Sequence, residues 1–413
     1  MLLRHFLKRL VRVGTLRVVD ANGRAYRFGE GGGRSSAIRL HDRKLHYKLF
    51  FHPSLYLGEA YMDGTLTIEE GDLGGFLELM LSNIERQESY PVQLYYETLQ
   101  RWLRPICTFN QVSRAKRNVA HHYDLSGRLY ELFLDKDRQY SCAYFTSGNE
   151  SLEVAQDNKK RHIASKLQIA RGHRVLDIGS GWGGLALYLA RAAEDVEVTG
   201  VTLSQEQLEE SRRRAADAGL ADRVKFALRD YREVEGRFDR IVSVGMFEHV
   251  GPGYYGDFFA KVKELLSDDG VCLLHSIGRM EPPGGTSPWL RKYIFPGGYT
   301  PALSEVLATV EKVGLWVTDV EILRLHYAKT LGEWRRRFMA NRQEILKLYD
   351  ERFCRMWEYY LTSCEVAFRY MRQMAMQIQL TKRLDAVPLT RDYMLDWERE
   401  HATQSDLSAS ARA

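Results

Sequence analysis

Three apolar runs in the sequence end in a carboxylate that could do chemistry. VLDIG reaches Asp177 just before a series of glycines, VKFALRD reaches Asp230, and RIVSVGMFEHVG reaches Glu248. A carboxylate at the carboxyl end of a buried strand can bind a polar ligand or hold a proton, because parallel sheets build their sites there. A solvated turn residue is the more common explanation for Glu248 taken alone.

The glycines after Asp177 favour a ligand-binding turn. Gly179, Gly181 and Gly183 let the backbone turn tightly and approach a ligand closely. Nicotinamide-dinucleotide sites have similar turns, but in them an acidic residue ends the second strand. In this chain the second strand is predicted to end in VTLS, without an acid. The D-x-G-x-G-x-G form instead resembles the S-adenosylmethionine-dependent methyltransferases, in which the loop passes under the methionine and ribose of the cofactor.

Further positions fit this resemblance. Such enzymes contact the adenine at the end of the third strand, where this chain has Asp230 and Tyr231. Thr202 and Gln207 flank the start of the next helix and are also assigned to the cofactor. Ser204 is a candidate N-cap, so that Gln207 could close a capping box or contact the ribose.

The elements around these residues alternate between strand and helix from about residue 155, which is typical of a parallel α/β sheet. Strands are predicted at 173–179, 196–204, 224–230, 238–245, 270–278 and 316–323. Helices are predicted from Gly184 and at 205–219, and a long aromatic helical region from about Leu331 to Leu380.

The N-terminal part has a different pattern. Short strands are expected at 15–20, 25–29, 36–42 and 65–71, and helices at 46–64, around an internal proline, and at 72–84. We predict a smaller α+β domain at 1–105, a basic linker that begins the catalytic domain at 106–135, the main catalytic domain at 136–400 and a disordered tail at 401–413.

Charge and composition narrow the function classes. The chain has 413 residues, a net charge of +5 and five cysteines without a CxxC pair. The cysteines favour a reducing compartment and argue against a metal site or a disulfide framework. No apolar run is long enough to span a bilayer. No acid lies between Glu97 and Asp124, where these basic residues occur: Arg101, Arg104, Arg114, Lys116 and Arg117.

Two basic segments could meet phosphate groups. The basic linker can attract lipid phosphate or can simply be solvated, and no nucleic-acid motif accompanies it. The N-terminal LLRHFLKRL has one apolar helical face, formed by Leu3, Phe6, Leu7 and Leu10. Such a helix can lie on an anionic membrane or pack on its own domain.

Six longer motifs occur in a fixed order: HHYDLSGRLYELFLDKDRQYSCAYF, VLDIGSGWGGLA, GVTLSQEQ, FDRIVSVGMFEHVG, YIFPGGYTP and HYAKTLGEW. Together they resemble the cyclopropane-fatty-acyl-phospholipid synthase family, which includes the mycolic acid cyclopropane synthases. The resemblance covers nearly the whole chain. It implies a Rossmann-like class I methyltransferase domain with a mostly parallel seven-stranded sheet, beside a small lipid-associated domain. Ser180 stands where many members carry Cys.

The resemblance also implies a reaction. S-adenosylmethionine methylates the cis double bond of an unsaturated phospholipid acyl chain, which leaves a carbocation. A base then removes a proton from the new methyl group and the ring closes, provided that water stays out. The family implies that the base is a bound bicarbonate.

The same resemblance assigns residues. The implied bicarbonate ligands are Cys142, Glu248, His275, Ile277 (through its backbone) and Tyr327. Tyr140 and Ser141 are implied to touch the cofactor. Tyr123 is expected near the active site with His122 in support, and His249 is expected to be structural.

The implied partners are an unsaturated phospholipid, an anionic membrane surface and a second copy of the chain. The chain is expected to be cytoplasmic and bound peripherally to the inner membrane, with an acyl tunnel walled by the aromatic helices and YIFPGG. Two alternatives stay open. One is a sister lipid C-methyltransferase that forms a methylene or methyl-branched chain, and the other is a lipid-binding protein with a vestigial cofactor fold.

Overall fold

The structure, a computed structural model, describes residues 2–85 and 126–402. Within these residues the chain forms two compact units, each assembled from separate segments. The first contains 2–85, 284–296 and 331–373, and the second contains 126–283, 297–330 and 374–402. The predicted boundaries at residues 105 and 135 fall in or beside the part of the chain outside the described residues, so the domain division stays a prediction.

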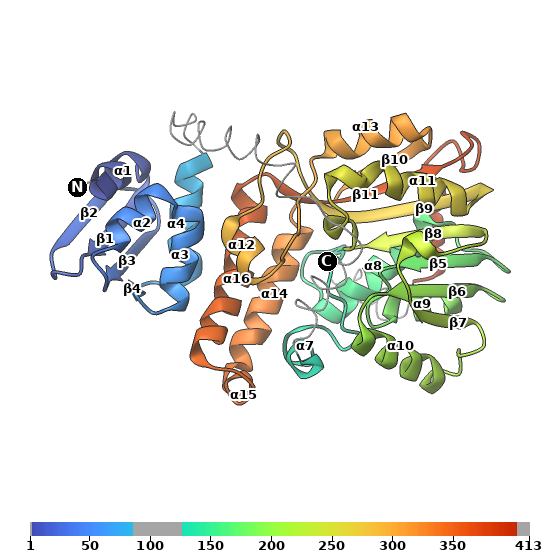
Figure 1. The fold of residues 1–413 in the computed structure, drawn as a ribbon, viewed down its shortest axis with the longest axis horizontal. Coiled ribbons are helices and arrows are strands. Elements are labelled where there is room, and N and C mark those ends of the chain that lie inside the picture. The colour runs from blue at the N-terminus through green and yellow to red at the C-terminus, as the bar shows by residue number, and fades with distance from the viewer. Residues whose placement is uncertain (1, 86–125, 403–413) are drawn as a thin grey trace. The chain divides into compact units, whose positions relative to one another are not determined.

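The N-terminal unit contains a four-stranded sheet in the order β2-β1-β3-β4 (Figure 1). Its strands are β1 (Gly14–Val19), β2 (Ala25–Gly31), β3 (Ser35–Leu40) and β4 (Leu66–Glu70). Its first helices are α1 (Leu2–Leu10), α2 (Leu45–Phe51), α3 (Pro53–Met62) and α4 (Leu73–Glu85). The expected strands and the proline break are confirmed. Pro53 begins α3, where its missing N–H costs no hydrogen bond.

The predicted long helical region is only partly correct. It contains α14 (His326–Ala340), α15 (Arg342–Leu346) and α16 (Glu351–Tyr370), but Gln373–Thr381 is a strand, β11. Gln, Met, Ala and Leu favour helices, and this local preference is overridden by burial between β9 and β10. Arg372, with a φ of 50°, ends the helical path. No helix within the described residues is long and apolar enough to cross a membrane.

The second unit is built on a seven-stranded sheet in the order β10-β11-β9-β8-β5-β6-β7. Its other strands are β5 (Arg174–Ile178), β6 (Glu197–Thr202), β7 (Val224–Leu228), β8 (Phe238–Val244), β9 (Leu266–Arg279) and β10 (Trp316–Ile322). The pairs β5–β6, β6–β7, β5–β8 and β8–β9 are parallel, whereas β10–β11 is antiparallel. The expected mostly parallel seven-stranded sheet is confirmed.

Helices pack on this sheet around two apolar cores, which contain Phe258 and Val306 in one case and Ile163, Leu189 and Leu208 in the other. The remaining helices are α7 (Gly127–Phe133), α8 (Leu152–Lys166), α9 (Gly184–Ala192), α10 (Gln205–Asp217), α11 (Tyr255–Leu265), α12 (Pro288–Tyr293), α13 (Leu303–Val313) and α17 (Asp392–Glu400), with α12 in the N-terminal unit. After β7 the chain returns to the opposite side of β5 to form β8 (Figure 1). This reversal opens a crevice at the carboxyl ends of β5 and β8.

Candidate functional site

The turn after β5 needs its glycines. Gly179, Gly181 and Gly183 have φ values of 82°, 52° and 81°, which residues with a side chain rarely adopt. A Cβ on Gly179 would lie 2.8 Å from Cβ of Met246, and one on Gly183 would lie 2.7 Å from the Phe226 ring. The predicted tight turn is confirmed, and α9 begins directly after it.

A cavity of about 1230 Å³, its open mouth included, lies at this edge of the sheet. Its lining includes these predicted cofactor residues: Tyr140, Ser141, Asp177, Gly179, Gly181, Thr202, Gln207, Asp230 and Tyr231. Gly183 lies outside the lining, against Phe226. Trp182, Met246 and His249 also line the cavity, although the sequence had not assigned them to a ligand.

Asp177 is the most unusual group in the lining. Its carboxyl is buried, and its Oδ2 finds no hydrogen-bond partner among the described residues. Burial raises the pKa of Asp177 to about 7, against the opposing charge of Lys159. A buried oxygen without a partner favours a site that is completed by a ligand.

The sequence did not identify the two residues that hold the segment around Ser141. Lys159 on α8 donates from Nζ to Oε1 of Gln139 at 2.7 Å and to Oγ of Ser141 at 2.8 Å. Gln156, one turn earlier, donates from Nε2 to the backbone oxygens of the same two residues. Burial lowers the pKa of Lys159 to about 8, while Asp135 opposes this shift. The available signal was the polar run QDNKKRH on a helix that must also pack on the sheet.

The start of α10 shows which of the two candidate residues caps the helix. Ser204 caps α10, since its Oγ accepts from the N–H of Gln207 at 3.3 Å. The side chain of Gln207 makes a different contact: its Oε1 accepts from Oγ1 of Thr202 at 2.8 Å. This contact holds Gln207 in the cavity lining beside Thr202.

Asp230 already has a cationic partner. Its two carboxylate oxygens accept from Nε and Nη2 of Arg232 at 2.8 and 2.7 Å. The ring of Tyr231 packs edge-on against Phe258, with ring centres 5.3 Å apart. Arg232 therefore fixes the Asp230 carboxylate just beyond β7, which stops at Leu228 rather than at Asp230 as predicted.

Glu248 lies beyond the strand that it was predicted to end. β8 stops at Val244, and Glu248 belongs to a short 3-10 helix, Phe247–His249. Its Oε1 accepts from the backbone N–H of Ile277 at 2.6 Å. Its Oε2 is shielded from solvent and has no hydrogen-bond partner in the part of the chain that the structure describes. Burial raises the pKa of Glu248 to about 7.

His275 lies two residues before Ile277 on β9 and is buried. Its Nδ1 lies 3.2 Å from Nε2 of Gln377, an amide nitrogen that can only donate. This contact with Gln377 holds the orientation of the His275 ring. Burial, together with the charges of Lys159 and Lys166, lowers the pKa of His275 to about 3, so the ring is neutral. Gln377 escaped the sequence prediction because it lies on β11, which was predicted to be helical.

Cys142 and Tyr327 approach one another through their neighbours. Cys142 is buried, which raises the pKa of its thiol and keeps it protonated. The next residue, Ala143, donates its N–H to Oγ1 of Thr330 at 3.0 Å. Thr330 lies one turn after the buried Tyr327 on α14. This contact attaches the segment that contains Cys142 and the cavity-lining Ser141 to α14.

The five implied bicarbonate ligands are brought together only in part. Glu248 and Ile277 are in direct contact, and the charge of Lys159 acts on both Cys142 and His275. All five lie outside the lining of the large cavity, and two of them, Cys142 and Glu248, directly neighbour the lining residues Ser141 and His249 in the chain. His122, Tyr123 and the basic linker lie outside the described residues.

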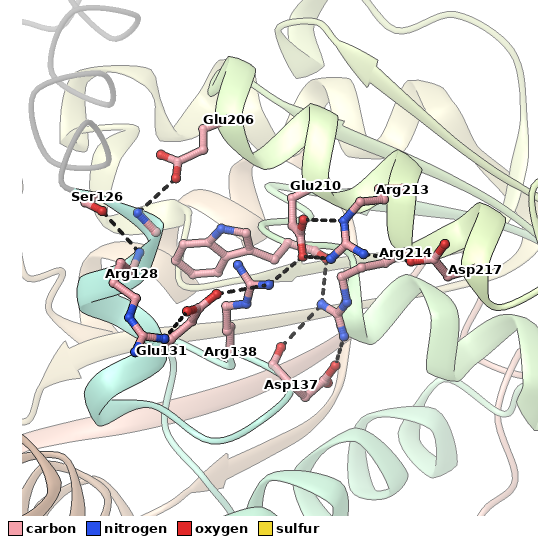
Figure 2. A network of polar contacts seen from close by, with 12 residues as sticks. Ser126, Arg128, Glu131, Asp137, Arg138, Glu206, Glu210, Arg213, Arg214 and Asp217 are labelled. Carbon is pink, nitrogen blue, oxygen red and sulfur yellow. Dashed lines mark hydrogen bonds and ion pairs between the residues drawn. The ribbon is translucent and has the colours of Figure 1, made fainter.

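A polar network fixes the segment that enters the cavity. Figure 2 shows Asp137 and Arg138 facing α10, where they pair with Arg214 and Glu210. Arg214 also donates to the backbone oxygen of Trp182 at 2.7 Å. Glu206 accepts from the backbone N–H at the start of α7 (Figure 2). The helix after β6 therefore anchors α7 and the residues that lead to Tyr140.

Comparison with known proteins assigns the family. Residues 110–378 match the family described as mycolic acid cyclopropane synthetase, which is more than half of the chain. The chain belongs to this family. It is 39% identical over 340 residues to the cyclopropane-fatty-acyl-phospholipid synthase of Escherichia coli K12, covering 82% of this chain and 86% of that protein.

Other members of the mycolic acid cyclopropane synthetase family differ in their named product. The chain is 36% identical over 375 residues to a tuberculostearic acid methyltransferase of Mycobacterium tuberculosis, covering 86% of this chain and 84% of that one. A solved mycolic acid cyclopropane synthase, in complex with SAH, superposes with a TM-score of 0.61 at 34% identity, over 64% of this chain and 97% of that chain. Family and fold together make this chain an S-adenosylmethionine-dependent methyltransferase.

Proposed function

We propose that this methyltransferase closes a cyclopropane ring on the cis double bond of an unsaturated phospholipid acyl chain. The observation that carries the proposal is Glu248, whose shielded Oε2 has no partner among the described residues while Ile277 holds Oε1. Methyl transfer to a nitrogen or oxygen atom needs no held base of the kind that Glu248 could position. The 39% identical Escherichia coli relative supports the phospholipid as substrate class.

The large cavity is the proposed cofactor site. When bound, S-adenosylmethionine supplies an electrophilic methyl group on a sulfonium. Asp177 fits such a ligand, because its unpaired Oδ2 can accept a hydrogen bond or face positive charge. The glycine turn lets the backbone approach the ligand. Tyr140 and Ser141 are positioned against it by Lys159 and the α10 network.

The reaction divides into two steps. The π electrons of the double bond attack the methyl carbon, the S–C bond breaks, and a carbocation remains on the acyl chain. A proton then leaves the new methyl group, and the electron pair of that C–H bond forms the third side of the ring. Water would quench the cation, so the burial of Cys142, His275 and Tyr327 suits the site to this chemistry.

Bicarbonate, when bound, would supply the base. Glu248 Oε2 is available to accept a hydrogen bond from its hydroxyl, and neutral His275 would donate from Nε2 in the tautomer that carries its proton there. Cys142 and Tyr327 would donate a thiol and a phenol proton. The N–H of Ile277 is already bonded to Glu248, so we propose that Ile277 acts by holding Glu248 rather than as a direct ligand.

A sister reaction is the second candidate. The tuberculostearic acid methyltransferase matches 86% of this chain, slightly more than the cyclopropane synthase does. In the sister reaction the same carbocation would lose a proton to give a methylene, and a methyl branch would then require reduction of that double bond by a separate reductase. The first step, and the residues proposed for the cofactor, would be the same.

We also propose that the chain is cytoplasmic, forms a homodimer and associates peripherally with the inner membrane. A phospholipid acyl chain is reached from the bilayer surface, and the relatives named above act on acyl lipids. This part of the proposal depends on the choice of substrate rather than on the catalytic residues.

Product analysis tests the proposal. The purified protein is incubated with S-adenosylmethionine and vesicles of cis-unsaturated phospholipid, and fatty acid methyl esters are analysed by gas chromatography and mass spectrometry. We expect a chain that is heavier by one CH2, resists mild hydrogenation and opens under forcing conditions. A heavier chain that takes up hydrogen easily would favour the sister reaction. No mass change, despite measured cofactor binding, would contradict both.

A further inference from the structure

The leucines on the apolar face of the N-terminal helix are not available to a membrane. Leu3, Leu7 and Leu10 of α1 are all buried within the N-terminal unit. Of the two alternatives for this helix, packing on its own domain is therefore confirmed, and these three leucines cannot lie on a bilayer. Any membrane contact of this unit must come from another surface.

The neighbouring helix α2 presents such a surface. Leu45 and Leu49 face the interior, whereas Lys44, Tyr47, Lys48 and Phe51 follow one another at helical spacing along the opposite side. We call these four residues the α2 stripe. Tyr47 is 65% exposed and Phe51 is 57% exposed. Within the described residues, the only other large aromatic side chain with comparable exposure is Trp316.

Aromatic and apolar residues continue from the α2 stripe onto α1, which packs beside α2 (Figure 1). The ring of Phe51 contacts that of Phe50, and Phe50 contacts Phe6 of α1, with ring centres 5.1 and 6.2 Å apart. Leu2, one turn before Phe6, is 51% exposed. Aromatic and apolar groups thus extend across both helices.

The charged side chains on the two helices have a single sign, and the nearby Asp42 accepts from the backbone N–H of Lys44. Neither LLRHFLKRL of α1 nor LHYKLFF of α2 contains an acidic residue, and Lys8 and Arg9 end α1. Lys44 is exposed, and Nζ of Lys48 lies over the Tyr56 ring at 5.1 Å. Exposed aromatic rings flanked by lysines suit the boundary between lipid headgroups and acyl chains, where the rings insert and the ammonium groups stay with the phosphates.

We propose that the α2 stripe, with Leu2 and Phe6, docks the N-terminal unit on the surface of an anionic lipid bilayer. The inference deepens the proposed function, since it assumes a lipid substrate. A second copy of the chain is a poorer occupant, because a symmetric contact through this surface would bring like charges together. Anionic lipid complements the charge and accepts the exposed rings.

Vesicle co-sedimentation of the full-length protein tests this surface. Wild type should bind phosphatidylglycerol vesicles more strongly than phosphatidylcholine vesicles, and its binding should weaken as salt is added. Lys44→Gln with Lys48→Gln should weaken binding about 25-fold, because each lysine near an anionic surface contributes about fivefold. Tyr47→Ser with Phe51→Ser should weaken it roughly tenfold and also on neutral vesicles.

Matched variants separate this surface from general effects. Trp316→Ser removes an equally exposed ring, and Lys225→Gln with Lys347→Gln removes two exposed charges elsewhere. Both controls should bind vesicles like wild type, and all variants should keep their melting temperatures. Stripe variants that bind like wild type would overturn the proposal. So would stripe variants that become monomers in analytical ultracentrifugation while wild type is a dimer, since the occupant would then be a second copy.

A parallel assay keeps the docking surface and the proposed function distinguishable. With substrate dispersed in detergent, the stripe variants should form product at the wild-type rate, and with vesicles they should be slower. Wild type that binds anionic vesicles through the stripe but forms no product in either system would leave the surface standing and overturn the proposed function.

Discussion

The ammonium of Lys159 lies 2.8 Å from the hydroxyl of Ser141, and the lysine side chain is almost fully buried. A buried charge is tolerated only with partners, which Ser141 and Gln139 provide here. This contact ties the cavity-lining segment to α8. It also places a positive charge where it acts on Asp177, Cys142 and His275.

Replacing Lys159 by Met should loosen this segment. We expect S-adenosylmethionine to bind ~10- to 100-fold more weakly in isothermal titration calorimetry, the range for losing hydrogen bonds to a charged group. Lys225→Met, at an exposed position, is the control. Ser141→Ala should add little to Lys159→Met, because both remove the same contact. Fully additive effects, or unchanged cofactor binding in Lys159→Met, would show that the contact is unimportant for the site.

The buried carboxyl of Glu248 should be visible in the pH dependence of stability. Its pKa is raised from 4.5 to about 7, so between these values the folded state holds a proton that the unfolded state has lost. The free energy of unfolding should therefore fall as pH rises through this window. Glu248→Gln cannot ionise and should gain stability relative to wild type from pH 5 to pH 8, by on the order of 1 kcal/mol.

Urea unfolding of both proteins at several pH values measures this difference. Asp177 has a similarly raised pKa but is present in both proteins, so its contribution cancels. Parallel pH profiles for wild type and Glu248→Gln would mean that Glu248 is not shielded from water. Product formation should be lost in Glu248→Gln even where its stability is higher.

Two glycine positions allow the steric clash of an added Cβ to be measured separately from backbone strain. Gly179 and Gly172 both have positive φ, but only a Cβ on Gly179 meets a neighbour, Met246 at 2.8 Å. Gly172→Ala should cost about 1 kcal/mol of stability, the strain alone. Gly179→Ala should cost about 1–3 kcal/mol more and should weaken cofactor binding. Equal losses in thermal unfolding would show that the close approach is relieved easily.

The ion pair between Arg138 and Glu210 should support cofactor binding. Arg138 lines the cavity, whereas Glu210 lies outside its lining. We expect Arg138→Gln and Glu210→Gln each to weaken binding severalfold, with a coupling of about 0.5–3 kcal/mol in a double-mutant cycle. Lys261 and Glu264, an ion pair on α11, form the control cycle. Independent effects of Arg138→Gln and Glu210→Gln would rule out the ion pair as the anchor of this segment.

Much of the frame could be predicted from local patterns. The glycines after Asp177 and the alternation of strand and helix are encoded within short windows, so β5 to β10 and their loops were found. The residues that were missed depend on contacts between distant segments. Lys159 and Gln156 have meaning only beside Gln139 and Ser141, and ion pairs such as Arg138–Glu210 leave no spacing rule in the sequence.

One wrongly predicted element concealed a residue that contacts the candidate site. Gln373–Thr381 contains good helix formers, and only its burial between β9 and β10 makes it a strand. Gln377, which orients His275, was lost with it. For α1 the sequence left two alternatives open, because amphipathicity could not distinguish a bilayer from the rest of the domain as the partner of Leu3 and Leu7.

Isotope labelling tests the central claim, ring closure by removal of a proton from the transferred methyl group, most directly. The protein is incubated with S-adenosylmethionine carrying a trideuterated methyl group and vesicles of cis-unsaturated phospholipid, and the acyl product is analysed by mass spectrometry before and after mild hydrogenation. We predict a product that keeps two of the three deuterium atoms and does not take up hydrogen. A product that keeps all three, or one that is readily hydrogenated, would contradict the account.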